Sequence, residues 1–260
     1  MSPRDVFVEA KGCKLFCRVG GAGDPVVVVH GGPGLSHSYL TELSELSYTH
    51  QLIFYDQRGS GRSTGELDQM HMDTFIEDLQ CIFTALNLKR ASLIGHSWGG
   101  LLAMKFAIDH PECINKMILI NSLPCTQTYD PLQQNLYMEG IYDIQLGISD
   151  GYRRLFRQFC HNPKSADMLN LDADPKGIAI RIKFEENFFM QSYNYESQLK
   201  QLNIPTLILH GENDLLPFSI AENLHRCIKN SVAITLPNCG HFPNVEQPEI
   251  LFHHLEKFLI

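Results

Sequence analysis

One serine of the sequence stands in a pattern that supports nucleophilic chemistry. Residues 95–100 read Gly-His-Ser-Trp-Gly-Gly, which places Ser97 at the centre of a G-x-S-x-G motif. A short apolar run precedes the motif and a mostly apolar, helix-like stretch follows it. A serine on such a tight turn needs small neighbours, here Gly95 and Gly99, and it lies beside the free N–H groups that begin the helix. The motif therefore predicts that Ser97 is a nucleophile.

A serine hydroxyl needs a base, and the base needs a group that orients it. Asp214 follows one strand-like run and His241 follows the last one, so the chain order is serine, acid, histidine. Both positions fall where parallel strands end, which is where active sites of open parallel sheets form. Glu212 is a second candidate for the acid, but it precedes the predicted turn. We expect Asp214 to orient His241 as the general base.

A glycine-rich turn supplies the third part of the predicted site. Residues 30–34 read His-Gly-Gly-Pro-Gly and follow another apolar run. The backbone N–H groups of Gly32 and Trp98 are the expected donors to a developing oxyanion. A phosphate-binding loop is excluded, because neither GK[ST] nor GxGxxG spacing is present. We expect His30 to stabilise the turn rather than to act as a second base.

The elements that must position these residues alternate between strand-like and helix-like segments. The apolar runs are short, rich in β-branched residues and bounded by glycine or proline, which suits strands buried on both faces. The expected strands are Val26–Val29, Gln51–Tyr55, Ala91–Ile94, Met117–Ile120, Thr206–Leu209 and Val232–Leu236. The expected helices include Asp73–Asn87, Gly99–His110 and Pro248–Leu259. Together with an antiparallel hairpin over residues 6–19, this alternation predicts a mainly parallel α/β sheet.

One interval is too long to be a simple crossover between strands. Residues 122–204 separate two consecutive strands, and they contain helix-like stretches at Gly151–Cys160 and Ile178–Met190. We therefore expect a core domain formed by residues 1–121 and 205–260, with a helical cap inserted over residues 122–204.

Composition limits the remaining possibilities. The 260 residues carry a formal net charge of −8 with no basic block, which gives nucleic-acid or membrane binding no electrostatic support. The sequence shows neither a signal peptide nor a membrane span, so a cytoplasmic location is expected. Eight scattered cysteines include no CxxC pair, and we expect free, mostly buried thiols. The sequence predicts neither a metal site nor a cofactor. The expected partner is a small-molecule or short-peptide substrate.

The whole chain resembles the α/β-hydrolase family, and three motifs resemble its proline iminopeptidase branch. They are the HGGPG turn, DQRGSGRS at residues 56–63, and GHSWGG around Ser97. The resemblance implies an eight-stranded sheet with a helical cap and a Ser97, Asp214 and His241 triad. It also implies removal of an N-terminal proline, with cap glutamates that hold the free amine. Glu186, in the stretch Glu-Asn-Phe-Phe, matches one of them.

The second amine-binding glutamate has no direct match. Cys160 stands at that position, and Glu139 and Glu185 are the alternatives.

We therefore predict a serine hydrolase that cleaves a small ester or amide through an acyl-enzyme. Within this class, an aminopeptidase for N-terminal proline and a carboxylesterase-like enzyme are both open, as are C–C bond hydrolases and lactonases. Two other classes remain. One is a ligand-binding receptor on a hydrolase fold, which the turnover of a generic ester would test. The other is a cofactor-free oxidoreductase or lyase, which product analysis would test.

Overall fold

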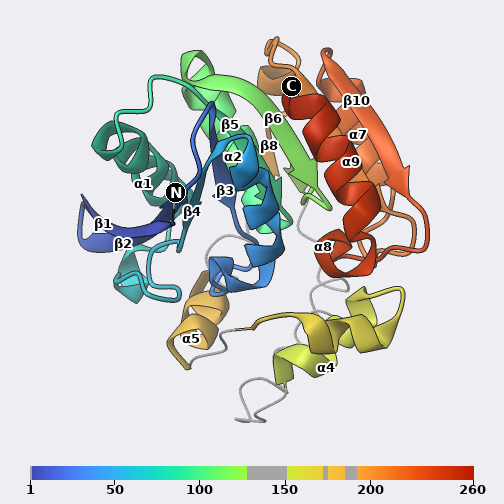
Figure 1. The fold of residues 1–260 in the computed structure, drawn as a ribbon, viewed down its shortest axis with the longest axis horizontal. Coiled ribbons are helices and arrows are strands. Elements are labelled where there is room, and N and C mark those ends of the chain that lie inside the picture. Colours follow the sequence, from blue (N-terminus) through green and yellow to red (C-terminus); the bar gives the residue numbers. More distant parts are fainter. Residues whose placement is uncertain (1, 128–150, 172–174, 185–191) are drawn as a thin grey trace.

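The structure is a computed structural model that describes residues 2–127, 151–171, 175–184 and 192–260. Its centre is an eight-stranded sheet with the strand order β1-β2-β4-β3-β5-β6-β9-β10 (Figure 1). β1 pairs antiparallel with β2 and β2 with β4, and every later pair is parallel. The predicted mainly parallel sheet and the antiparallel hairpin at its edge are confirmed.

The strands are short and mostly apolar, as their sequences predict. Their bounds are β1 Arg4–Ala10, β2 Cys13–Gly20, β3 Pro25–Val29, β4 Gln51–Tyr55, β5 Ala91–His96, β6 Ile114–Ile120, β9 Thr206–Gly211 and β10 Ser231–Leu236. β6 begins three residues before the apolar run that predicts it, because Ile114–Lys116 continue the same extended backbone.

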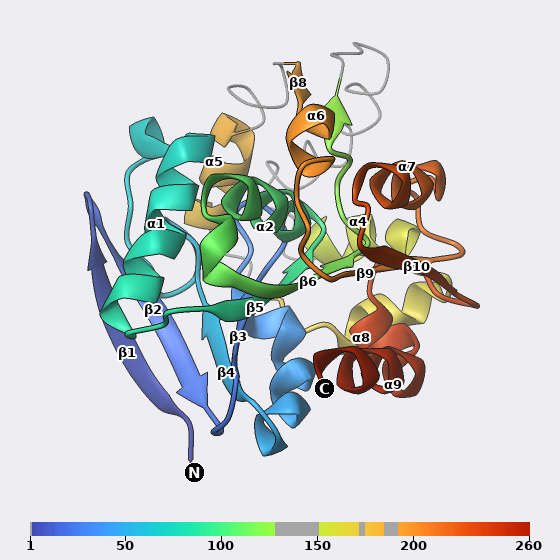
Figure 2. The ribbon, with the colours of Figure 1, turned by 90° about the horizontal axis from the view of Figure 1, so that it is seen from above.

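Helices cover both faces of the sheet, so the central strands are buried on both sides. Successive side chains of a strand point to opposite faces, and in β3 Val27 and Val29 join one hydrophobic core while Val26 and Val28 join the other. Figure 2 shows α1, α2, α6 and α7 on one side of the sheet and α8 and α9 on the other. This burial explains the uninterrupted apolar runs of the central strands.

The three predicted core helices correspond to α1, α2 and α9, with bounds within two residues of the prediction, and three shorter core helices, α6, α7 and α8, were not predicted. The α-helices are α1 Met72–Ala85, α2 Trp98–Asp109, α6 Glu196–Leu199, α7 Ser219–Cys227, α8 Pro243–Glu246 and α9 Pro248–Leu259. Four 3₁₀ segments, which are more tightly wound than α-helices, are also present: η1 His37–Tyr48, η2 Leu67–Gln69, η3 Pro111–Cys113 and η4 Pro163–Met168.

Further helices lie beyond the carboxyl ends of the strands. α4 Gly151–Phe159 and α5 Pro175–Phe184 occupy the end of the molecule toward which β6 and β10 point (Figure 1). The chain leaves and re-enters the core at a single place, because β7 Thr126–Gln127 pairs antiparallel with β8 Tyr193–Asn194. The helical cap is thus present, while its extent over residues 122–204 stays a prediction.

Two kinds of feature are absent from the part of the chain that the structure describes. No helix among them has the length and apolarity needed to cross a membrane. The same residues form no cluster of three or more histidine, cysteine, aspartate or glutamate side chains that could hold a metal ion.

Candidate active site

Ser97 occupies the turn between β5 and α2, in a backbone conformation that is rare for a side-chain-bearing residue. Its φ is 54° and its ψ is −120°. Such strain persists only where the surroundings enforce it, and it is typical of a nucleophile held at a strand-to-helix turn. A Cβ atom on Gly95 would collide with the carbonyl oxygen of Gly99, and one on Gly99 would collide with that of Val29. Both glycines are therefore required by close backbone packing, as the motif predicts.

His241 and Asp214 come together beyond the ends of β9 and β10. Nδ1 of His241 lies 2.8 Å from Oδ2 of Asp214, and both side chains are almost fully buried. Oδ1 of Asp214 accepts the backbone N–H of Leu216 at 3.0 Å, and Oδ2 also accepts the side-chain amide of Asn121. The carboxylate is thus held in place by three donors.

The environment of Asp214 favours its charged form. Burial by itself raises the pKa of this carboxyl, but the charge and hydrogen bond of His241, with those of Asn121 and Leu216, outweigh burial and leave the pKa lowered. The rival acid, Glu212, is exposed and accepts the backbone N–H of Asn238 at 3.3 Å. The geometry therefore assigns the contact with His241 to Asp214.

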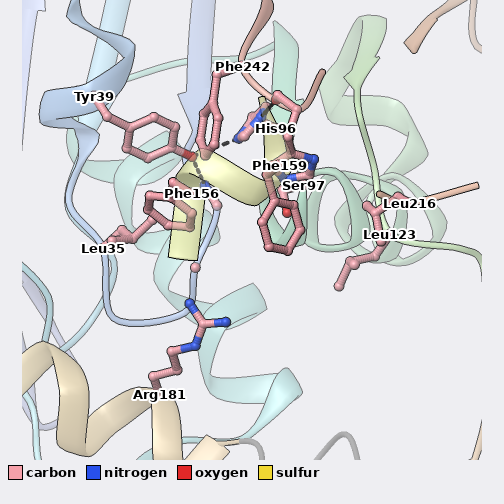
Figure 3. Close-up of a pocket in the computed structure, with 13 residues that line it drawn as sticks. Leu35, Tyr39, His96, Ser97, Leu123, Phe156, Phe159, Arg181, Leu216 and Phe242 are labelled. Carbon is pink, nitrogen blue, oxygen red and sulfur yellow. Dashed lines mark hydrogen bonds between the residues drawn. The ribbon is translucent and has the colours of Figure 1, made fainter. Parts of the chain in front are cut away.

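Ser97 and His241 line the same pocket. Figure 3 shows Ser97 among side chains from the core and the cap. Gly31 and Gly32 form another part of the pocket wall, and Gly32 has a φ of 123°, a backbone conformation that favours glycine. The remaining lining is mostly apolar or aromatic and comes from both the core and the cap: Leu35, Tyr39, His96, Leu123, Phe156, Phe159, Arg181, Leu216 and Phe242.

The two predicted oxyanion donors belong to different elements around the pocket. Gly32 borders the pocket, while Trp98 begins α2 directly after the serine. The indole of Trp98 is buried and donates to the side chain of Gln57 at 2.9 Å. Its side chain therefore points into the core, so that only its backbone N–H is suited to the predicted role.

His30 anchors the glycine-rich turn. Its Nε2 atom accepts the backbone N–H of Gln57 at 3.0 Å, and its own carbonyl oxygen accepts the amide of the same glutamine at 2.6 Å. Burial lowers the pKa of His30 to about 4, so the ring is neutral at physiological pH. The histidine holds the turn after β3 rather than facing the pocket.

The predicted amine-binding residues cannot be placed. Glu186 lies outside the described residues, and so do Glu139 and Glu185, the candidates for the second glutamate. Cys160, at the position of the missing glutamate, is buried, and burial raises the pKa of its thiol to about 12. A neutral thiol cannot replace a carboxylate as the partner of an ammonium group.

Sequence reasoning missed three residues at the site: Asn121, Tyr39 and Arg181. Asn121 directly follows β6, so its place at a strand end could have revealed it. Tyr39 lies in the 3₁₀ segment η1, where no periodicity points to the pocket. Arg181 belongs to α5, and its guanidinium points toward the pocket from the cap (Figure 3).

Comparison with known proteins agrees with this fold. Residues 24–248 match the family of the alpha/beta hydrolase fold, and the chain belongs to this family. The family match, together with the relatives and solved structures below, shows that this protein is a hydrolase.

Two curated relatives belong to one branch of this family. The chain is 27% identical to a proline iminopeptidase of Lactobacillus acidophilus, with 90% of this chain and 89% of the relative covered. It is also 27% identical to a proline iminopeptidase of Clostridioides difficile, with 97% of each chain covered. The predicted resemblance to the proline iminopeptidase branch is confirmed.

Solved structures show the fold. An esterase from Exiguobacterium antarcticum superposes with a TM-score of 0.84 at 22% identity, covering 98% of this chain and 99% of the esterase. A thermophilic esterase from Thermogutta terrifontis superposes with a TM-score of 0.82 at 23% identity, covering 98% of each chain. The predicted α/β-hydrolase fold is confirmed.

Proposed function

We propose that the protein cleaves a small ester or amide through an acyl-enzyme formed on Ser97. The observation that carries this proposal is the 2.8 Å contact between His241 and Asp214, in a site where His241 and Ser97 share one pocket. His241 takes the proton from the serine hydroxyl as the oxygen attacks the carbonyl carbon, and it then gives that proton to the leaving group. Water attacks the acyl-enzyme in the second half of the cycle, with the same histidine as base.

Charge develops on the carbonyl oxygen during both halves of this cycle. The backbone N–H groups of Gly32 and Trp98 are the proposed donors to that oxygen. The N–H of Gly31 already donates to the hydroxyl of Tyr39 at 2.6 Å, which favours Gly32 as the donor of this loop. Loss of one such donor in other enzymes slows the reaction ~10²–10³-fold.

We further propose that the acyl group is an N-terminal proline of a short peptide. Two observations support this choice. The curated relatives reported above are proline iminopeptidases, and the pocket wall near Ser97 is formed by apolar and aromatic side chains that suit a small saturated ring. The free amine of such a substrate needs a carboxylate partner, because an unpaired buried ammonium is costly. Glu186 is the proposed partner.

A panel of three chromogenic substrates tests both levels of the proposal. They are L-proline p-nitroanilide, its N-acetylated form and p-nitrophenyl acetate. We expect release of nitroaniline from the first substrate only, loss of that activity in Glu186→Gln, and full activity in the matched control Glu249→Gln, which changes an exposed glutamate of α9. Ester cleavage without amide cleavage would instead favour a carboxylesterase-like enzyme.

The nucleophile is tested independently of the substrate. A fluorophosphonate probe reacts with an activated serine, and we expect it to label the wild-type protein and not Ser97→Ala. Hydrolysis by Ser97→Ala at a rate near that of the wild type would overturn the acyl-enzyme proposal, whichever substrate is cleaved.

The cysteines bear on the cellular location of the protein. All eight cysteines are free, and burial raises the pKa of most of their thiols. Free thiols of this kind suit the reducing environment of the cytoplasm, which is the location we propose.

A further inference from the structure

A buried histidine, His96, links the parts of the site in a way that the proposed mechanism does not use. It is the last residue of β5 and directly precedes Ser97. Its Nδ1 atom lies 2.8 Å from the hydroxyl oxygen of Tyr39, and its Nε2 atom lies 2.7 Å from the backbone carbonyl oxygen of His241. Figure 3 shows the Tyr39 and His96 side chains meeting beside Ser97.

The direction of every hydrogen bond in this chain follows from the chemistry of its ends. A carbonyl oxygen only accepts, so Nε2 of His96 must carry the proton that it donates to His241. Nδ1 of His96 is then an acceptor, and the hydroxyl of Tyr39 donates to it. The oxygen of Tyr39 in turn accepts the backbone N–H of Gly31 at 2.6 Å.

Burial keeps both side chains in the protonation states that this chain requires. Burial, together with the neighbouring His241, lowers the pKa of His96 to about 3, so the ring remains neutral with a single proton. Burial also raises the pKa of the Tyr39 hydroxyl, so it remains protonated. The direction of this hydrogen-bond chain is therefore the same over the whole pH range in which the enzyme can be assayed.

The hydrogen-bond chain joins the three segments that carry the reacting groups. Gly31 precedes the proposed oxyanion donor Gly32, His96 precedes the proposed nucleophile Ser97, and the last acceptor belongs to His241 itself. We propose that Tyr39 and His96 are positioning residues, which hold the oxyanion loop, the nucleophile and the general base in register with one another. This inference rests on the proposed function of Ser97.

The alternative is that the two side chains only fill space between the sheet and the cap. The ring of His96 lies 5.4 Å from Tyr39 and 5.6 Å from Phe242, so an apolar side chain would find neighbours there. In that case the hydrogen bonds would affect folding alone. The two possibilities differ in how substitutions act on the folded enzyme.

Glutamine provides the conservative replacement for His96. Its amide NH₂ can donate to the carbonyl of His241 while its amide oxygen accepts from Tyr39, as the neutral imidazole does. Leucine fills a similar volume without either hydrogen bond. Tyr39→Phe removes only the hydroxyl group. Tyr55→Phe is the matched control, because it removes another buried hydroxyl that has no hydrogen-bond partner among the described residues.

The experiment measures the rate constant with which a fluorophosphonate labels Ser97, together with kcat and KM on whichever panel substrate is cleaved. We expect His96→Leu and Tyr39→Phe to lower the labelling rate and kcat at least tenfold with KM changed less than threefold. His96→Gln should stay within about threefold of the wild type, and Tyr55→Phe should be unchanged. The double variant should be no slower than the worse single variant, since both break one chain.

Urea unfolding of each variant separates positioning from folding. If His96→Leu and Tyr39→Phe are less stable but their folded forms label Ser97 at the wild-type rate, the positioning role is wrong. The same holds if His96→Gln is as slow as His96→Leu. A different result, full hydrolysis by Ser97→Ala, would show instead that the proposed nucleophile is wrong.

Discussion

The backbone N–H of His241 donates a hydrogen bond to the carbonyl oxygen of Phe159 across 2.8 Å. Phe159 is the last residue of α4, and its ring lies 5.3 Å from the imidazole of His241. The neighbouring Gly240 packs so closely that a Cβ atom there would collide with the same carbonyl. A helix beyond the sheet thus contacts the proposed base directly, so the position of α4 and the position of His241 are coupled.

Glu246 strengthens this coupling, and its removal should weaken the fold. One carboxylate oxygen accepts the backbone N–H of Gly240 at 2.8 Å, and the other accepts that of Asn162 at 3.2 Å. Glu246→Ala leaves both N–H groups without this acceptor, and we expect it to lower the free energy of unfolding by about 1–3 kcal/mol. Glu246→Gln keeps one acceptor oxygen and should lose less.

Urea unfolding measures this loss, with Glu249→Ala on the exposed face of α9 as the control. The loop that carries His241 loses the hydrogen bond between Gly240 and Glu246 in this variant. We therefore also expect kcat of Glu246→Ala to fall while KM stays within a few-fold. Glu246→Ala with the stability and kcat of the wild type would show that the bridge is dispensable.

Asp214→Asn should separate the orientation of His241 from its presence. The amide matches the carboxylate in size but offers no negative charge, and it can donate where the carboxylate accepts from Nδ1. The wrong tautomer of His241 would then face the serine. The equivalent change in serine proteases lowers kcat ~10⁴-fold, and we expect a similar loss here with the fold intact by circular dichroism. A loss of less than tenfold would indicate another acid.

The pH dependence of the reaction should report the histidine and not the aspartate. The pKa of Asp214 is lowered, because the charge and hydrogen bonds of its partners outweigh the effect of burial. The carboxylate therefore stays ionised as the pH falls from neutrality. His241 accepts the proton only when neutral, so kcat/KM should decline on the acid side as this ring takes up a proton.

A profile of kcat/KM between pH 4.5 and 9 checks this expectation. The decline should follow a single protonation, and it should persist in Glu186→Gln, which removes no part of the proposed triad. A rate that is flat down to pH 4.5 would contradict the role of His241 as the base.

Much of the site could be predicted from the sequence because it depends on strand ends. Ser97, Asp214 and His241 each follow a run of apolar residues that is readable as a buried strand, and the carboxyl ends of parallel strands meet at one edge of the sheet. Gly95 and Gly99 signal the tight turn on their own. Local patterns were sufficient here because the backbone geometry is itself local.

The hydrogen-bond chain through His96 was beyond such patterns. Tyr39 and His96 are 57 residues apart, and nothing in η1 marks the tyrosine as facing the pocket. The short pairing of β7 with β8 was missed because two residues a strand leave no periodicity to detect. Such features arise from the packing of segments that are distant in the sequence, so they leave no local pattern from which they could be predicted.

A buried ion pair gives the last prediction, which concerns stability. The guanidinium of Arg58 donates to both carboxylate oxygens of Asp78, at 2.8 and 2.6 Å, and each side chain is about 1% exposed. Arg58→Met would leave the carboxylate buried without its partner, and we expect a loss of about 3–5 kcal/mol in the free energy of unfolding. Since burial raises the pKa of Asp78, its protonation should reduce this loss as the pH is lowered.

The double variant Arg58→Met/Asp78→Leu should regain most of the stability, because neither charge is then buried. Urea unfolding at pH 8 and pH 5 measures both effects. A single variant as stable as the wild type at pH 8 would show that this pair does not stabilise the fold.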